Sequence, residues 1–158
     1  MQRGPTVAIV MGSESDRPIM EETVKILDGF GISNELQVMS AHRAPERVRR
    51  FARSAEANGT RIIIAGAGGA AHLPGVIAGQ TTLPVIGVPI MGASMMGLDS
   101  LLSIVQMPGG VPVATVAVGS AGARNAAYLA AAILSLSDEQ IRLKYRQFRM
   151  EQSGGELE

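Results

Sequence analysis

The sequence of 158 residues contains no Cys and no Trp, two His, and only five Phe and Tyr residues together. Without Cys the chain has no thiol nucleophile, no thiolate zinc site and no disulfide from which a compartment could be inferred. Two His cannot build a metal centre of three His ligands, so we expect no metal site. Five aromatic side chains are too few for the base-stacking surface of a nucleic-acid binder.

Net charge and long apolar runs are also absent. The chain has 14 basic and 14 acidic side chains, so it lacks the basic surplus of proteins that follow nucleic-acid phosphates. The apolar run near the N-terminus, Val7–Met11, is shorter than the core of a signal peptide, which has about 7 to 15 residues. No stretch reaches the roughly 18 to 20 apolar residues that span a membrane. We therefore expect a cytoplasmic protein with no membrane or nucleic-acid partner.

Short β-branched runs alternate along the chain with helical patterns, which is typical of βαβ units and a parallel sheet. The runs are mostly apolar rather than alternating, as in strands that are covered on both faces. They predict five strands, at Thr6–Met11, Glu35–Met39, Arg61–Ala65, Pro84–Val88 and Val113–Val118. No repeat or linker interrupts the pattern, so we expect residues 1–158 to form a single α/β domain.

Apolar residues at helical spacing lie between and after the predicted strands. Pro45 opens one such stripe, and proline is favoured in the first turn of a helix. Gly154, Gly155 and the acidic end predict a frayed tail. The pattern predicts helices around Met20–Leu27, from Pro45 to about Ala55, and at 98–106, 121–134 and 138–152.

One long interval has almost no charge. Between Arg61 and Arg124 the only formally charged residue is Asp99, and twelve of the 19 Gly fall there. The solvated loops of a monomer normally carry several charges over such a length. A single central core would explain the interval in part, but a chain of this size has too little interior for all of it. We therefore expect a core together with a subunit interface.

The first predicted strand ends in the loop Gly12-Ser13-Glu14-Ser15-Asp16. In open parallel sheets, ligands bind outside the carboxyl ends of the strands. Ser and Asp at the start of a helix can cap backbone N–H groups, but the same free N–H groups and hydroxyls also bind phosphate or ribose. Two Ser and one Asp exceed what a single cap needs, so both interpretations of Ser13 and Asp16 stay open.

The second predicted strand ends in Ser40-Ala41-His42-Arg43-Ala44-Pro45. Imidazole exchanges protons near neutral pH, and the guanidinium of Arg43 is a fixed cation that suits a phosphate or a carboxylate. Alternatively, Arg43 pairs with a surface carboxylate and His42 bonds only to backbone. The position at a strand's carboxyl end favours a functional site.

The third predicted strand leads into a glycine-rich loop at residues 66–75. Gly66, Gly68 and Ala71 fit the spacing of a dinucleotide-binding fingerprint, but the acidic residue expected about 20 positions later is missing. Nothing acidic follows until Asp99. We interpret the glycines as allowing close approach of the backbone to a ligand. His72 is either a second site histidine or, as we favour, a support for this loop.

Together the three loops resemble one enzyme family. The matching segments are Gly-Ser-Glu-Ser-Asp at 12–16, Ser-Ala-His-Arg-Ala-Pro at 40–45 and Ala-Gly-Ala-Gly-Gly-Ala-Ala-His-Leu-Pro-Gly at 65–75, with further similarity at 83–89, 98–108 and 119–127. The chain resembles the 5-(carboxyamino)imidazole ribonucleotide mutases, the class I PurE enzymes of purine synthesis, from about residue 6 to about residue 134.

The resemblance implies a flavodoxin-like, three-layer α/β/α fold and a homo-octamer with active sites near subunit contacts. It also implies a mutase without ATP, metal, biotin or any other cofactor. In this reaction the carboxylate on the exocyclic nitrogen of the ribonucleotide moves to a ring carbon by way of trapped CO2. By position, His42 is the general acid and base. The residues expected to bind the ribonucleotide are Ser13, Asp16 and Arg43, and in addition Ser40, Gly68 and His72.

One residue departs from the family pattern. Arg17 stands where the family more often has an aromatic residue, and it flanks the first loop without replacing a site group.

Three other functions stay open. A class II-type carboxylase would add free CO2 to aminoimidazole ribonucleotide. A non-catalytic flavodoxin-like module would bind a nucleotide such as FMN, which the few aromatic residues disfavour. A purely structural oligomer would leave the His-Arg loop without a role.

Overall fold

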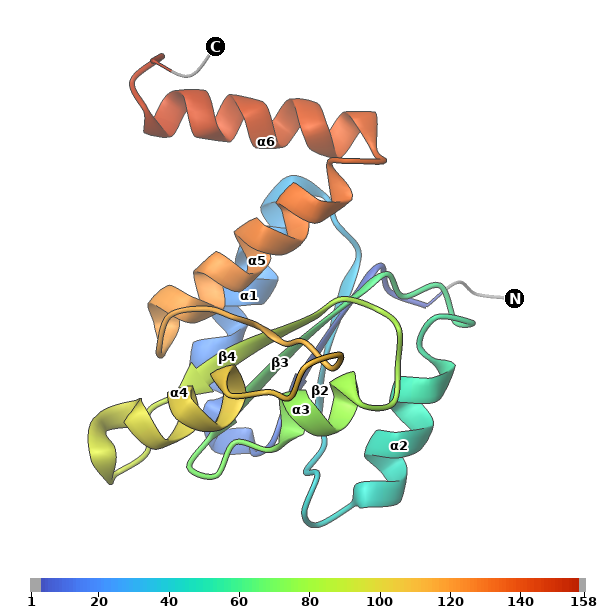
Figure 1. Ribbon diagram of the computed structural model, residues 1–158. Coiled ribbons are helices and arrows are strands. Elements are labelled where there is room, and N and C mark those ends of the chain that lie inside the picture. The colour runs from blue at the N-terminus through green and yellow to red at the C-terminus, as the bar shows by residue number, and fades with distance from the viewer. Residues whose placement is uncertain (1–3, 157–158) are drawn as a thin grey trace.

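The computed structural model describes residues 4–156, and its centre is a five-stranded parallel sheet (Figure 1). The strands lie in the order β2-β1-β3-β4-β5. Their bounds are β1 (Val7–Met11), β2 (Asn34–Val38), β3 (Ile62–Gly68), β4 (Val85–Ile90) and β5 (Ala114–Thr115). The predicted α/β class and the five parallel strands are confirmed.

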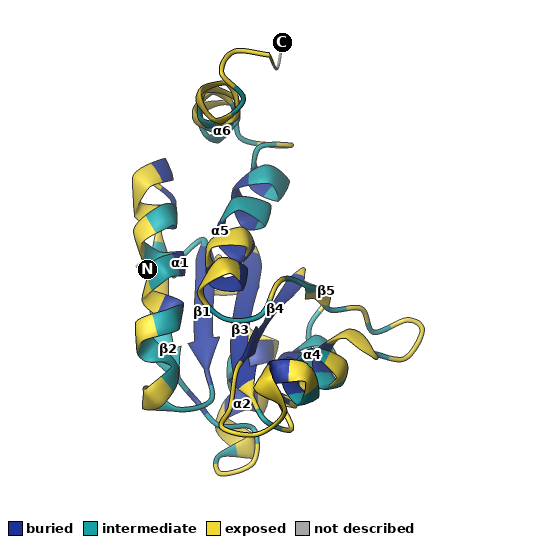
Figure 2. Ribbon diagram, turned by 90° about the vertical axis from the view of Figure 1, so that its left-hand side faces the viewer, coloured by how far each residue is buried: buried dark blue, intermediate teal, exposed yellow. Residues whose placement is uncertain are grey.

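Helices cover both faces of the sheet and give three layers. One face carries α1 (Arg17–Phe30) and α5 (Ser120–Leu134), and the other carries α2 (Pro45–Ser54), α3 (Leu73–Ala78) and α4 (Leu98–Val105). Because side chains alternate along a strand, Val7, Ile9 and Met11 enter the first layer while Ala8 and Val10 enter the second. Figure 2 shows that the middle strands are buried almost throughout.

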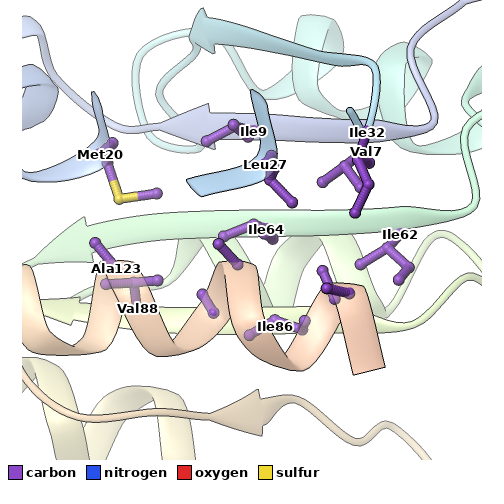
Figure 3. Packing of buried hydrophobic residues seen from close by; sticks show 14 of the residues in the cluster. Val7, Ile9, Met20, Leu27, Ile32, Ile62, Ile64, Ile86, Val88 and Ala123 are labelled. Atoms are coloured by element: carbon purple, nitrogen blue, oxygen red, sulfur yellow. The ribbon is translucent and has the colours of Figure 1, made fainter. Parts of the chain in front are cut away.

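The alanine-rich helix α5 lies inside the chain's own core. Small side chains let α5 pack closely against α1 and against the isoleucines of β3 and β4, as Figure 3 shows around Ala123. The buried Thr23 of α1 donates a hydrogen bond to the Ala123 carbonyl over 2.8 Å. Ala127 and Ala130 are both fully buried in this layer. The alanine-rich helix, whose first turn lies at the end of the nearly uncharged interval, is therefore part of the core.

The predicted elements differ most from the structure at β5, at the end of β3 and at α3. Strand β5 covers two residues instead of six, and beyond Thr115 only single hydrogen bonds join the edge segment to β4, from Val116 N to Gly87 O and from Gly119 N to Pro89 O. Pro89 has no N–H to donate, which weakens a continuous ladder there. Strand β3 runs on to Gly68, and the segment predicted as loop up to residue 75 contains the start of α3.

The C-terminal helix α6 (Glu139–Gln152) stands away from the sheet and packs on the ends of α1 and α5 (Figure 1). Its N-cap Asp138 accepts hydrogen bonds from the backbone N of Gln140 and Ile141. The rings of Phe30, Tyr128, Tyr145 and Phe148 hold the helix in place through edge-to-face, tilted and stacked contacts. The predicted frayed tail includes residues 157 and 158, which lie outside the described residues. None of the helices within 4–156 has the length and apolar character needed to cross a membrane.

Two helical glycines test this packing in opposite directions. A Cβ at Gly122 of α5 would overlap the carbonyl oxygen of Ala117, whereas a Cβ at Gly29 of α1 meets nothing within 4 Å. We expect Gly122→Ala to lower the free energy of unfolding by about 1 to 3 kcal/mol. Gly29→Ala should raise it by about 0.5 to 1 kcal/mol, because Ala has the higher helix propensity. Urea denaturation measures both, and a stabilised Gly122→Ala variant would contradict the close approach.

Candidate active site

Three loops meet at one edge of the sheet because β1, β2 and β3 are parallel and in register. Met11 at the end of β1 pairs with Val38 of β2 and with Gly66 of β3. The loops that follow these strands surround a cavity of about 500 Å³. All seven residues predicted for the site line this cavity, namely Ser13, Asp16, Ser40, His42, Arg43, Gly68 and His72. The structure therefore brings the whole predicted set together at one place.

In the first loop, Ser13 and Asp16 differ in their local roles. Ser13 is the N-cap of the short 3-10 helix η1 (Glu14–Asp16), and its Oγ accepts hydrogen bonds from the N and the Oγ of Ser15, over 3.4 and 3.0 Å. Asp16 precedes α1 but makes no side-chain cap bond. Capping thus accounts for Ser13 in part, whereas the Asp16 carboxylate needs another explanation.

The environment of Asp16 disfavours its charged form. Burial at the cavity wall raises the pKa of the Asp16 carboxyl, and hydrogen bonding from the Ser13 backbone and the Ser15 side chain opposes this shift only in part. A half-buried carboxylate of this kind gains from a ligand that donates hydrogen bonds to it. The two hydroxyls of a ribose are such donors.

Arg43 joins the second loop to the first. Its Nη2 donates to the carbonyl oxygen of Gly12 over 3.0 Å, and its backbone N donates to Ser40 Oγ over 3.2 Å. No carboxylate within residues 4–156 forms an ion pair with Arg43. The alternative of a surface ion pair is therefore not what the structure shows. The charge of Arg43 is available to an anionic ligand in the cavity.

The two histidines of the chain meet in this cavity. Nε2 of His42 lies 2.7 Å from Nδ1 of His72, and the rings are nearly perpendicular with centroids 4.9 Å apart. His42 is thus bonded to another imidazole rather than to backbone only. His72 supports the second loop as well as its own.

The end of β3, where the third loop begins, lies close to the adjacent strand β4. A Cβ at Gly68 would lie 3.1 Å from the carbonyl oxygen of Ile90 in the adjacent strand. Ala71 is buried and has a left-handed backbone, with φ of 44°. A non-glycine residue in this region is strained and is held there by its surroundings. This turn directs the chain from β3 into α3 and places His72 at the cavity.

Some lining residues were not assigned from the sequence. Ser15, Ala41 and Leu73 also line the cavity; Ser15 belongs to the first motif, so its hydroxyl could have been assigned with Ser13. Arg17 forms an ion pair with Glu14 and is not among the lining residues. Within 4–156 no three His, Asp or Glu side chains gather in a way that could hold a metal ion.

Sequence comparison with known proteins supports the family that the three loop motifs indicate. Residues 6–154 match the family model described as AIR carboxylase. The N5-carboxyaminoimidazole ribonucleotide mutase of Pyrococcus abyssi is 57% identical over 145 residues, which are 92% of this chain and 82% of the relative. The mutase of Escherichia coli K12 is 51% identical over 152 residues, which are 96% of this chain and 90% of the relative.

A solved structure extends the agreement to the fold. The crystal structure of Treponema denticola PurE matches with a TM-score of 0.87 and 32% identity, and the match covers 96% of this chain and 93% of that chain. The flavodoxin-like layers and the family predicted from the three loops are both confirmed. The chain belongs to the AIR carboxylase family.

Proposed function

We propose that this chain is an N5-carboxyaminoimidazole ribonucleotide mutase of de novo purine synthesis. The observation that supports this most directly is the single cavity that contains His42, Arg43, Asp16 and Ser13. It offers the imidazole of His42 as a proton donor and acceptor, one fixed cation and a set of polar groups for a ribonucleotide. The mutases of Pyrococcus abyssi and Escherichia coli are named for this reaction.

The first half of the reaction needs an acid. His42 donates a proton to the exocyclic nitrogen of the substrate, the bond from that nitrogen to the carboxylate carbon breaks, and its electron pair stays on nitrogen. The carboxylate leaves as CO2 and the amine remains neutral. A positioned acid of this kind accelerates such a step by about 10²- to 10⁴-fold.

The second half needs a base at the same place. The ring carbon next to the amine attacks CO2 and forms the new carbon–carbon bond, and His42 then removes the proton from that carbon. The imidazole returns to its starting protonation state, so no external acid or base is consumed. Ala67, Gly68 and Ala71 line the cavity without a competing nucleophile. CO2 and the amine held together there react as a positioned pair.

The other lining residues bind the ribonucleotide. We assign Arg43 to the phosphate, since it is a cation without a carboxylate partner in the described chain. Asp16 accepts from the ribose hydroxyls, and Ser13, Ser40, Gly68 and His72 complete the contact surface. No cofactor takes part, because each proton and the carboxylate are returned within one turnover.

The residues that line the cavity also bear on the two alternative functions, a flavin-binding module and a class II-type carboxylase. Among the described residues 4–156, no Phe or Tyr lines the cavity, so neither of these rings is placed to stack on a flavin. A class II-type carboxylase would use the same ribose and phosphate contacts and differ in taking CO2 from solution. The requirement for added bicarbonate separates that function from the mutase.

We further propose that the protein is a homo-octamer. The loop after β4 and the outer face of α4 expose Met91, Met95, Met96, Leu98, Leu102 and Val105, in the interval where Asp99 is the only charge. Met96 is 81% exposed and Leu102 is 46% exposed. Figure 2 shows this helix at the surface of the molecule. Contiguous exposed apolar side chains of this kind are typical of interfaces between subunits.

His42→Asn tests the mechanism. The Asn amide keeps hydrogen bonding but cannot exchange the proton, so turnover should fall by at least about 100-fold while the ribonucleotide still binds. The assay converts the carbamate substrate without ATP and without added bicarbonate. The same replacement at His72 serves as the control and should lose less turnover. If His42→Asn turns over like the parent, or if the parent itself needs bicarbonate, the assigned mechanism is wrong.

Asp16→Asn should weaken binding and stabilise the fold at the same time. The pKa of Asp16 is raised in the folded chain, so folded protein binds this proton more readily than unfolded protein, and stability falls as pH rises through that range. At neutral pH the amide removes this cost and Tm rises; at acidic pH the gain disappears. Loss of charge-assisted hydrogen bonds should weaken ribonucleotide binding about 10- to 100-fold.

Glu14→Gln provides the matched control for Asp16→Asn. Glu14 lies in the same short helix, but its ion pair with Arg17 lowers the pKa of the Glu14 carboxyl. The control should leave Tm unchanged or lower it, because the native state favours that charge. An Asp16→Asn variant that is less stable than the parent at neutral pH would contradict this account.

Light scattering tests the assembly at micromolar concentration. Eight chains of 16.5 kDa give a particle of about 130 kDa. Leu102→Glu places a charge on the exposed face of α4 and should give smaller particles, while its circular dichroism stays that of the parent. A parent protein with the mass of one chain would overturn the octamer, and an unchanged octamer in Leu102→Glu would remove α4 from the interface.

A further inference from the structure

The contact between His42 and His72 joins two loops that are 30 residues apart in sequence. Nε2 of His42 and Nδ1 of His72 lie 2.7 Å apart, at hydrogen-bond distance. A hydrogen bond between two neutral imidazoles has one proton on this line, because one ring donates its N–H and the other accepts with its bare nitrogen. The contact therefore orders the His42 ring and fixes which of its nitrogens stays available.

The backbone on both sides of His72 is anchored. His72 follows Ala71, which is buried and whose N–H donates to the Gly68 carbonyl over 3.1 Å. It precedes the buried Leu73, and its own carbonyl accepts from the N–H of Val76 in α3 over 2.9 Å. His42 lies in the turn between β2 and α2, and both histidines are exposed. The anchored backbone on both sides of His72 thus supports the contact with His42.

We propose that His72 is a positioning residue that orients His42 and sets its tautomer. Since Nε2 of His42 is engaged with His72, Nδ1 is the nitrogen that gives and takes the proton of the ribonucleotide. When His42 becomes cationic, the facing nitrogen of His72 accepts the Nε2 proton in a charge-assisted hydrogen bond. This inference rests on the proposed function, because it assigns a second residue to the same proton transfer.

Two replacements at His72 separate positioning from proton transfer. Asn places an amide nitrogen or oxygen at the atom position of Nδ1, so His72→Asn retains the hydrogen bond to His42 but cannot carry a proton. His72→Leu fills similar space without a polar atom. We expect His72→Leu to lose about 10- to 100-fold in kcat with a smaller change in KM. His72→Asn should recover most of that loss.

Three outcomes overturn the proposal. If His72→Asn is as slow as His72→Leu, His72 carries the proton itself. If His72→Leu turns over like the parent, the contact has no role in catalysis. If both variants lose only affinity, His72 binds substrate and does not position His42. Thermal unfolding of each variant establishes that the loss is not one of folding.

A second measurement tests the contact without turnover. The chain contains only two His, so protein labelled with ¹⁵N-histidine and free of a histidine tag gives just two sets of ring signals. The parent and His72→Asn should show His42 in one tautomer, and His72→Leu should show the averaged shifts of an imidazole that exchanges between tautomers. His42 shifts that are the same in all three proteins would overturn the proposal. A parent without mutase turnover would refute the proposed function and leave this test of the contact intact.

Discussion

The parallel pairing of β1 with both β2 and β3 is the constraint on which the cavity depends. It sets Val38 and Gly66 beside Met11. Three chain segments that are distant in sequence therefore leave the sheet side by side, at the carboxyl ends of their strands. A slip of one residue in either pairing would turn the side chains of that strand to the opposite layer. The two buried layers oppose such a slip, since the side chains of β1 and β3 alternate between them.

The strands and the three loops could be predicted from sequence because both depend on local chemistry. Apolar runs mark strands that are covered on two faces, and polar or glycine-rich segments mark their ends. Once the strands are parallel, Asp16, His42 and His72 must lie near one another. Their grouping therefore follows from topology rather than from any single motif.

Other features depend on three-dimensional contacts that no local pattern encodes. The short extent of β5 reflects its place at the edge beside Pro89, and the short helix α3 depends on the left-handed turn at Ala71. The bond between His42 and His72 requires both turns to have the observed geometry. Sequence could assign two histidines to one edge of the sheet, but not which nitrogens face each other.

Both edges of the sheet are poorly suited to pairing with another strand. At one edge, β2 has polar Asn34, Glu35 and Gln37 among its five residues, and at the other, β5 pairs over only two residues. Short edges and inserted charges oppose the addition of a foreign strand, which is the first step of sheet aggregation. The association that we propose through the exposed apolar face of α4 would therefore not extend into an open-ended sheet.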